Sequence, residues 1–201
     1  MKNKIYAFLS EIASTSRLML LLLLLFLPSL VNAQTVQFTA DSIPEVNGEV
    51  VFNVDFKYDL KKSEFYDRAY YYLNRTMDPY SGMFLVNNDD FTVCEVTDYL
   101  NISSSAFQVF AMYMTYSLQL TYMDGLCNLV IKDIRFMEKG YFETQEESTR
   151  ELIMPEHSGK DIMIDKNYSR LLSGNPSDKI TALTLDRINE IIQNLDISFA
   201  K

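Results

Sequence analysis

One short segment gathers the groups that nucleophilic catalysis requires. Glu156, His157 and Ser158 follow one another, and Asp161 comes three residues later. A hydroxyl, an imidazole and a carboxylate form a catalytic triad when separate structural elements hold them rigidly together. Here they are neighbours in one stretch that contains Gly159. The sequence therefore favours a surface histidine, and we predict no catalytic residues.

Metal-binding residues are few. The chain has one histidine and two cysteines, which excludes multi-histidine sites and four-thiolate zinc or iron–sulfur sites. The pair Asp89-Asp90 lacks further oxygen ligands at calcium-loop spacing, and the preceding Asn87-Asn88 indicates a turn. Met112 and Met114 alternate with other apolar residues, which is typical of core filling rather than of a copper or haem site. We predict no metal and no cofactor.

The first 33 residues have the order of a secretory signal peptide. Three cations come first: Lys2, Lys4 and Arg17. An apolar run over 18–27 follows, and Val31-Asn32-Ala33 supplies the cleavage pattern. A membrane anchor is the alternative, but a span needs about 20 apolar residues, and Pro28 interrupts the run. We predict export to the periplasm or the medium, cleavage after Ala33 and no stable membrane insertion afterwards.

Composition and charge exclude several classes of protein. Of the 201 residues, 48% are hydrophobic and 22% charged, which excludes collagen-like, low-complexity and mostly disordered chains. Removing residues 1–33 takes away three of 18 cations and one of 27 anions, which leaves 15 against 26, a net charge of −11 over 168 residues. Such a chain repels phosphate backbones, so we predict no nucleic-acid partner.

The remaining sequence predicts the element order β-α-β-β-β-β-α. Residues 34–48 are polar and are expected to lead into a single domain over 49–199. Alternation predicts a first strand over 49–56, and an apolar stripe predicts a helix capped by Ser63 and ending near Asn74. Four strands are then expected, over 83–86, 91–96, 107–123 and 126–137, with a tight turn at Asp124-Gly125. A closing helix is expected over Thr184–Phe199.

Between the last strand and the closing helix, residues 138–180 are charged and irregular. We predict a long solvated connection there, with one short helix over 165–172. Changes of phase near Val109 or Phe110, and again near Lys132, predict bulges in both long strands and hence a bent sheet.

The long strand over 107–123 has one apolar and one polar face. The polar row is Tyr113, Thr115, Ser117, Gln119 and Thr121. One apolar face indicates that helices cover only one side of the sheet. The predicted fold class is therefore α+β, with two helices on one face of a curved antiparallel sheet.

Cys94 and Cys127 raise the question of a disulfide, since exported proteins fold in oxidising surroundings. In a simple meander the two residues lie two strands apart, about 9–10 Å. A disulfide requires Cα atoms within about 7 Å. We predict two free, mostly buried thiols.

Four segments carry a family resemblance. They are Val46-Asn47-Gly48-Glu49-Val50-Val51-Phe52, Ser63-Glu64-Phe65-Tyr66-Asp67-Arg68-Ala69, Met123-Asp124-Gly125 and Thr184-Leu185-Asp186-Arg187-Ile188-Asn189. The chain resembles an exported family, common in Bacteroidetes, that has the domain of unknown function 4468 and a TATA-binding-protein-like (TBP-like) fold. It departs from the family in having no basic run after Gly125. The resemblance implies a two-layer fold and an exported location. It implies no activity and no DNA binding, because function follows the site.

Three functions remain open. The first is a non-catalytic module of the bacterial envelope that binds a protein, peptide or glycan through the polar row on 107–123. A row of this kind also describes any solvated sheet face. The second is a cystatin-like inhibitor, which requires an exposed wedge of loops, and the third is a hydrolase, which requires convergent catalytic groups. We favour the first.

Overall fold

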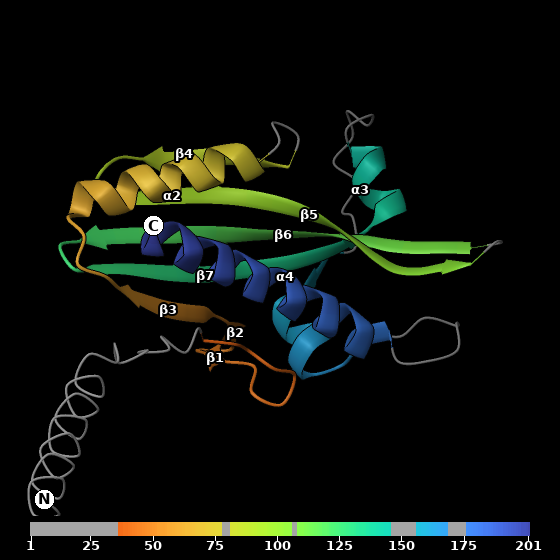
Figure 1. The fold of residues 1–201 in the computed structure, drawn as a ribbon. Helices are drawn as coiled ribbons and strands as arrows, with labels where there is room; N and C mark the ends of the chain where they lie inside the picture. Colours follow the sequence, from red (N-terminus) through yellow and green to blue (C-terminus); the bar gives the residue numbers. More distant parts are fainter. Residues whose placement is uncertain (1–35, 78–80, 106–107, 146–155, 169–175) are drawn as a thin grey trace, which may run out of the picture. The chain divides into compact units, whose positions relative to one another are not determined.

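The computed structural model describes residues 36–77, 81–105, 108–145, 156–168 and 176–201 (Figure 1). At its centre is an antiparallel sheet with the strand order β3-β7-β6-β5-β4. These strands are β3 (Phe52–Lys57), β4 (Gly82–Asn87), β5 (Phe91–Ser105), β6 (Gln108–Met123) and β7 (Leu126–Glu138). The predicted four-strand meander is present, and the first strand lies beside the last. The segment β5 is much longer than the strand predicted over 91–96.

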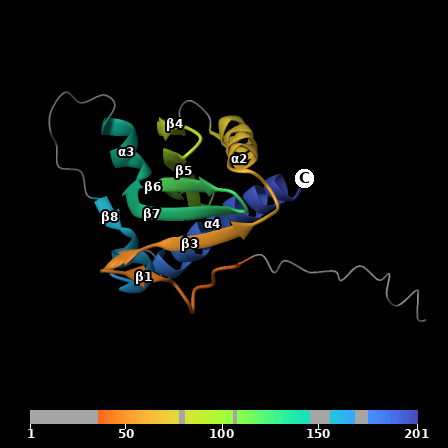
Figure 2. The same ribbon diagram turned by 90° about the vertical axis from the view of Figure 1, so that its left-hand side faces the viewer.

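Helices α2 (Lys62–Thr76) and α4 (Pro176–Ala200) pack on the same face of the sheet (Figures 1 and 2). The facing side chains of β6 are almost fully buried: Met112, Met114, Tyr116, Leu118 and Leu120. The helix α4 contributes an apolar stripe: Ile188, Ile191, Ile192 and Leu195. The predicted α+β architecture, with an alternating long strand under two amphipathic helices, is confirmed.

The segment predicted as a polar leader is part of the fold. The strands β1 (Glu45–Val46) and β2 (Glu49–Val50) form a hairpin whose turn residues, Asn47 and Gly48, have φ angles of 53° and 88°. Phe38 packs edge-on against Phe52, with ring centroids 4.8 Å apart, and its N–H donates to the Asn189 side chain over 2.9 Å. The polar composition of the segment gave no sign of this packing, because only one partly buried aromatic ring and one hairpin hold the segment on the domain.

Both helices begin earlier than predicted. In α2 the N-cap is Lys61, whose N–H donates to the Glu64 carboxylate, while the N–H of Lys62 donates to Asp124; both distances are 2.8 Å. These carboxylates satisfy N–H groups at the start of the helix, so Ser63 lies in the first turn and is not the cap. The helix α4 begins at Pro176, because proline lacks the N–H that a first helical position leaves unpaired.

In its described parts, the stretch 138–180 contains more helix and strand than predicted. It contains α3 (Lys139–Gln145), β8 (Glu156–Ser158), which pairs with the end of β7, and a π-helical turn η1 (Lys160–Ile164). Two fully buried side chains, Ile162 and Met163, tie η1 to the core. Of the helix predicted over 165–172, the residues up to 168 are not helical, and the others lie outside the described residues. Within the described ranges, none of the helices is long and apolar enough to cross a membrane.

Two irregularities bend the long strands. The pairing of β6 with β7 shifts between Thr115 and Ser117, opposite Asp133, whose φ is 55°. This confirms the bulge predicted near Lys132. The pairing of β5 with β6 shifts between Asn101 and Ser103, so the extra residue lies in β5, opposite the predicted position in β6. The prediction of a bulge in β6 near Val109 or Phe110 is therefore wrong, since the extra residue of a bulge changes the phase of its own strand.

Candidate binding surface on the open face of the sheet

The five residues of the predicted polar row lie on the face of β6 that points away from α2 and α4. The pairing register places them opposite open-face residues of β5, from Tyr99 opposite Tyr113 to Phe91 opposite Thr121. Thr121 is exposed, and the other four side chains are half-buried. The row is therefore present as predicted, although its two ends have different surroundings.

Helix α3 covers the Tyr113 end of the row, which corrects the prediction that helices cover one face only. The ring of Phe142 stacks on Tyr113 with centroids 4.1 Å apart, and the Tyr113 hydroxyl donates to Glu143 over 3.2 Å. Tyr99 packs edge-on against the Tyr113 ring, with centroids 5.4 Å apart. Such a cover is favourable because it buries part of an aromatic side chain on the open face. Tyr113 is thus a packing residue of this face.

Beyond Tyr113, the centre of the face is hollowed. Ser117 lines a hollow of about 480 Å³ together with Glu95 of β5 and Arg135 of β7. Asp133 of β7 also lines it, with three residues from other segments: Glu49 of β2, Ser158 of β8 and Lys160 of η1. The bulge at Asp133 shapes this hollow, because it changes the phase of β7 and turns Arg135 onto the open face.

The charges around the hollow pair with one another. One Arg135 nitrogen lies 3.4 Å from Glu95 and another lies 3.5 Å from Glu156. Lys160 donates to Glu45 over 2.6 Å, and this hydrogen bond raises the pKa of the Lys160 ammonium. These side chains are 37–45% exposed, so the ion pairs are screened by solvent and contribute little to stability. A polar ligand can therefore replace such contacts at small cost.

Glu95, Arg135 and Lys160 are functional candidates that sequence reasoning missed. Glu95 pairs with Ser117 across the β5–β6 register, and Arg135 pairs with Thr115 across β6–β7. Both residues occupy polar positions in strands that the sequence predicts. The strand alternation was therefore visible, but the cross-strand register that brings opposite charges together was not.

Gln119 and Thr121 continue the open face toward the β6–β7 turn. Gln119 lies between Val93 of β5 and Val130 of β7, and Thr121 lies opposite Asn128. The Asn128 amide donates to both Asn53 and Asp55 of β3, each over 2.7 Å. This part of the surface presents amide and hydroxyl groups and one carboxylate beside the charged hollow. The two parts together can contact a polar ligand through hydroxyl, amide and charged groups.

The residues around His157 do not form a triad. The Ser158 hydroxyl donates to Asp161 over 2.6 Å, and hydrogen bonds from Ser158 lower the pKa of this carboxyl. The His157 ring instead packs edge-on against Tyr168, with centroids 4.9 Å apart. The serine and aspartate thus stabilise the start of η1. Among the residues that the structure describes, no group of three His, Cys, Asp or Glu side chains is placed to hold a metal ion.

Cys94 and Cys127 are free and buried. They lie on β5 and β7, which are separated by β6, and pair there with Leu118 and Tyr122. Burial raises the pKa of each thiol to about 12. Both side chains belong to the covered face and are remote from the hollow.

Comparison with known proteins gives the fold. No protein-family model and no curated protein matches this sequence. A solved DUF4468 family protein from Bacteroides ovatus superposes with a TM-score of 0.61 at 17% identity, over 79% of this chain and 91% of that chain. The fold is TBP-like. A TBP-like protein from Parabacteroides distasonis also has a TM-score of 0.61, at 12% identity, over 79% of this chain and 97% of that one.

The resemblance seen in the sequence is therefore confirmed at the level of the TBP-like fold. Because the identities are low, this likeness describes the backbone architecture and assigns no activity to particular residues. The function must be argued from the surface itself.

Proposed function

We propose that this protein is an exported, non-catalytic binding module of the bacterial envelope. Its ligand, a polar segment of a protein, a peptide or a glycan, occupies the open face of the sheet around Ser117 and Gln119. The observation that carries this proposal is the hollow of about 480 Å³ at the centre of the predicted polar row. Its size is within the range of about 300–1,000 Å³ that ligand pockets occupy.

The lining of the hollow favours a polar, uncharged or mixed-charge ligand. Glu95 and Arg135 bring a carboxylate and a guanidinium group, 3.4 Å apart, to the hollow, and Ser117 adds a hydroxyl group to its lining. Polyanions are disfavoured because Glu49 and Asp133 also line the hollow. Hydrogen bonds to charged groups give orientation as well as affinity, which suits recognition of hydroxyl or amide groups.

Export is supported by the order of cations, apolar run and small residues in the first 33 residues. Intact mass and N-terminal sequencing of protein recovered from the envelope fraction test this part. We expect a chain that begins at Gln34, and a full-length chain in the cytoplasm would contradict it.

Site-specific photo-crosslinking in envelope preparations tests the binding surface. A photoreactive residue at position 119 is expected to capture one defined partner, whereas the same residue at exposed position 179 of α4 is the matched control. Ser117→Arg fills the hollow and should abolish capture without changing the unfolding midpoint, because position 117 is half-buried on the open face. Equal capture from both positions, or capture that survives Ser117→Arg, would refute the proposed surface.

A further inference from the structure

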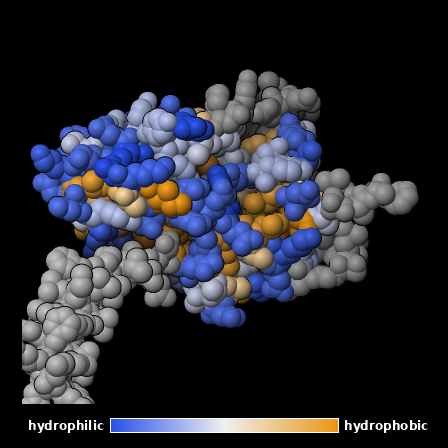
Figure 3. All heavy atoms as spheres, in the orientation of Figure 1, coloured by the Kyte–Doolittle hydropathy of each residue, from blue (hydrophilic) through white to orange (hydrophobic). Residues whose placement is uncertain are grey.

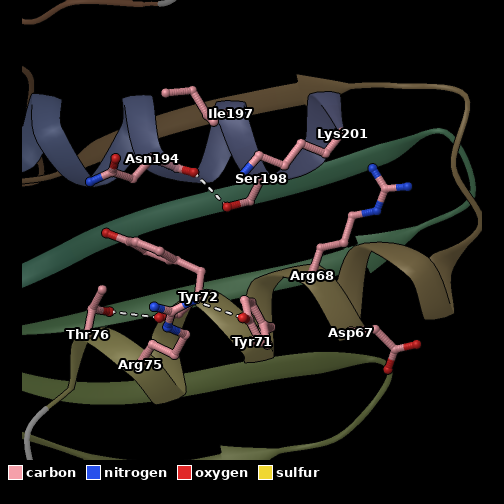
Figure 4. Close-up of a pocket in the computed structure, with 10 residues that line it drawn as sticks. All are labelled: Asp67, Arg68, Tyr71, Tyr72, Arg75, Thr76, Asn194, Ile197, Ser198 and Lys201. Carbon is pink, nitrogen blue, oxygen red and sulfur yellow. Dashed lines mark hydrogen bonds between the residues drawn. The ribbon is translucent and has the colours of Figure 1, made fainter.

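A second surface lies between the two helices, on the opposite side of the molecule's core from the open face. Two helix faces line a groove of about 710 Å³ (Figure 4). From α2 come Arg68, Tyr71, Tyr72 and Arg75; from α4 come Asn194, Ile197 and Ser198, and Lys201 follows the end of α4. The α2 set has the spacing i, i+3, i+4 and i+7 and the α4 set the spacing i, i+3 and i+4, which places each set on one side of its helix. Figure 3 shows this face of the molecule, with apolar side chains between hydrophilic ones.

The charge of this groove is opposite to that of the chain. Three cations, Arg68, Arg75 and Lys201, line it with one acid, Asp67, although acidic residues outnumber basic ones by 27 to 18 in the whole sequence. A local excess of positive charge on an acidic protein gathers anionic ligands there.

The arginines of the groove also differ from the other described arginines. Arg135 forms ion pairs with Glu95 and Glu156, and Arg187 forms them with Asp98 and Glu190. Arg68 and Arg75 have no acidic partner among the described residues. Arg68 donates to the Phe199 carbonyl over 2.7 Å, and Arg75 donates to the Tyr71 hydroxyl over 2.8 Å.

These neutral contacts position the two guanidinium groups and leave most of their donors for a ligand. Each guanidinium has five N–H donors, and the bond described for each arginine uses one of them. Arg75 also lies over the Tyr71 ring, 5.3 Å from its centroid. Seven residues of helix separate the two arginines by about 10 Å. The groove therefore suits a ligand with two planar anionic groups about that far apart.

We propose that the groove between α2 and α4 binds an acidic peptide segment with two carboxylates about 10 Å apart, one for Arg68 and one for Arg75. In a polyproline II chain, which has three residues per turn and rises about 3.1 Å per residue, carboxylates three residues apart lie on the same side at about this distance. Tyr71 and Ile197, which are 64% and 46% exposed, offer apolar contact to the side chains between the carboxylates. A short peptide meets mainly the local cations, whereas a wide anionic surface such as a membrane also meets the acidic remainder of the chain and is repelled.

Fluorescence anisotropy with the purified protein tests this proposal. The probe is a labelled ten-residue peptide with two glutamates three residues apart and leucines between them, and its partner probe carries glutamines instead. We expect binding of the glutamate peptide only. Arg68→Gln and Arg75→Gln should each weaken binding about ten-fold, since each removes a charged hydrogen-bonding fork. Lys179→Gln removes one exposed cation of α4 outside the groove and should leave binding unchanged.

A purely structural role for the arginines makes a different prediction. An arginine in the last turn of a helix, such as Arg75 in α2, can stabilise the helix because its positive charge interacts favourably with the helix dipole. Arg75→Lys keeps that charge but loses the planar fork, so it should retain the unfolding midpoint and still weaken peptide binding. The proposal is overturned if the glutamine peptide binds equally well, if Lys179→Gln weakens binding as much as Arg75→Gln, if Arg75→Lys binds like the unaltered protein, or if only vesicles of anionic phospholipid bind.

Discussion

The covered and the open face of the sheet use the same strands for different purposes. On the covered face, Leu118 and Tyr116 are 1% exposed and pack under helices. On the open face, Ser117 of the same strand lines a hollow with Glu95 and Arg135 from the neighbouring strands. Alternation along a strand therefore decides which side chains are buried, while pairing between strands decides which polar groups meet. The core depends on the first property and the candidate site on the second.

The ion pairs on the two faces of the sheet also differ in length and in exposure to water. Arg187 reaches into the covered face, where its Nε lies 2.9 Å from Asp98 and the Tyr116 hydroxyl donates to the same carboxylate over 2.8 Å. Arg135 on the open face contacts its two acids at 3.4 and 3.5 Å. The Arg187–Asp98 pair is short and mostly shielded from water, so it contributes to stability. The contacts of Arg135 with its two acids are longer and more exposed, so a ligand can displace them at small cost.

The largest expected effect concerns the two thiols of the covered face. Iodoacetamide should modify Cys94 and Cys127 at least about 1,000-fold more slowly in the native protein than in urea, because reaction requires unfolding. Burial raises the pKa of both thiols to about 12 from 9.0, so the folded state holds these protons more tightly. Their contribution to stability is complete below about pH 9 and is lost as the pH rises toward 12.

Mass spectrometry of the alkylated protein and unfolding measured from pH 8 to 11 provide the readouts. The intact mass should be the same with and without reductant, since both cysteines are free. Rapid native alkylation, or a mass lower by two daltons before reduction, would contradict the placement of the cysteines on separated strands.

The next effect compares two truncations on one strand. Leu118→Ala should lower the free energy of unfolding by about 3 kcal/mol, because it leaves a cavity under the helices. Thr121→Ala, on the exposed face of β6, should change it by less than about 0.5 kcal/mol. Urea denaturation measures both. Similar losses for the two variants would mean that the open face is covered in solution.

A smaller effect on the free energy of unfolding is expected when the arginine of each ion-pair cluster is replaced. Arg187→Met leaves the Asp98 carboxylate without its cation and should cost about 2 kcal/mol, a value reduced from that of a fully buried pair because the side chains are 25% and 18% exposed. Arg135→Met, the matched open-face variant, should cost less than about 1 kcal/mol. Equal costs in urea denaturation would remove the distinction drawn between the faces.

Sequence reasoning identified the elements that alternation and amphipathic stripes encode. The long strand with Met112 on one side and Ser117 on the other, the closing stripe that includes Ile188, and the phase change near Lys132 all appear in the structure. These features are local, because each depends on residues that are neighbours within one element.

Contacts between distant segments could not be predicted in this way. Phe142 on Tyr113 and Phe38 on Phe52 join residues that no periodicity connects. The hollow depends on the register that places Glu95 opposite Ser117. The groove between α2 and α4 likewise needs two helix faces to meet. The seven-residue spacing of Arg68 and Arg75 is visible in the sequence. The two arginines became candidates only when the structure showed that each donates to an uncharged group.

The smallest expected effect concerns the bulge that shapes the open face. Asp133 has a φ of 55°, in the left-handed region, where a Cβ atom costs about 1 kcal/mol and a branched side chain costs more. Asp133→Gly should therefore leave stability unchanged or raise it by up to about 1 kcal/mol, and Asp133→Val should lower it by about 1–2 kcal/mol.

Lys57→Val is the matched control for this bulge, because Lys57 is exposed in an extended strand at the edge of the same face. Valine fits an extended backbone, so this variant should not lose stability in urea denaturation. If Asp133→Val costs no more than Lys57→Val, the backbone at Asp133 is not held in the left-handed region. The bulge then does not turn Arg135 toward Glu95, and the hollow loses the feature that distinguishes it from an ordinary solvated sheet face.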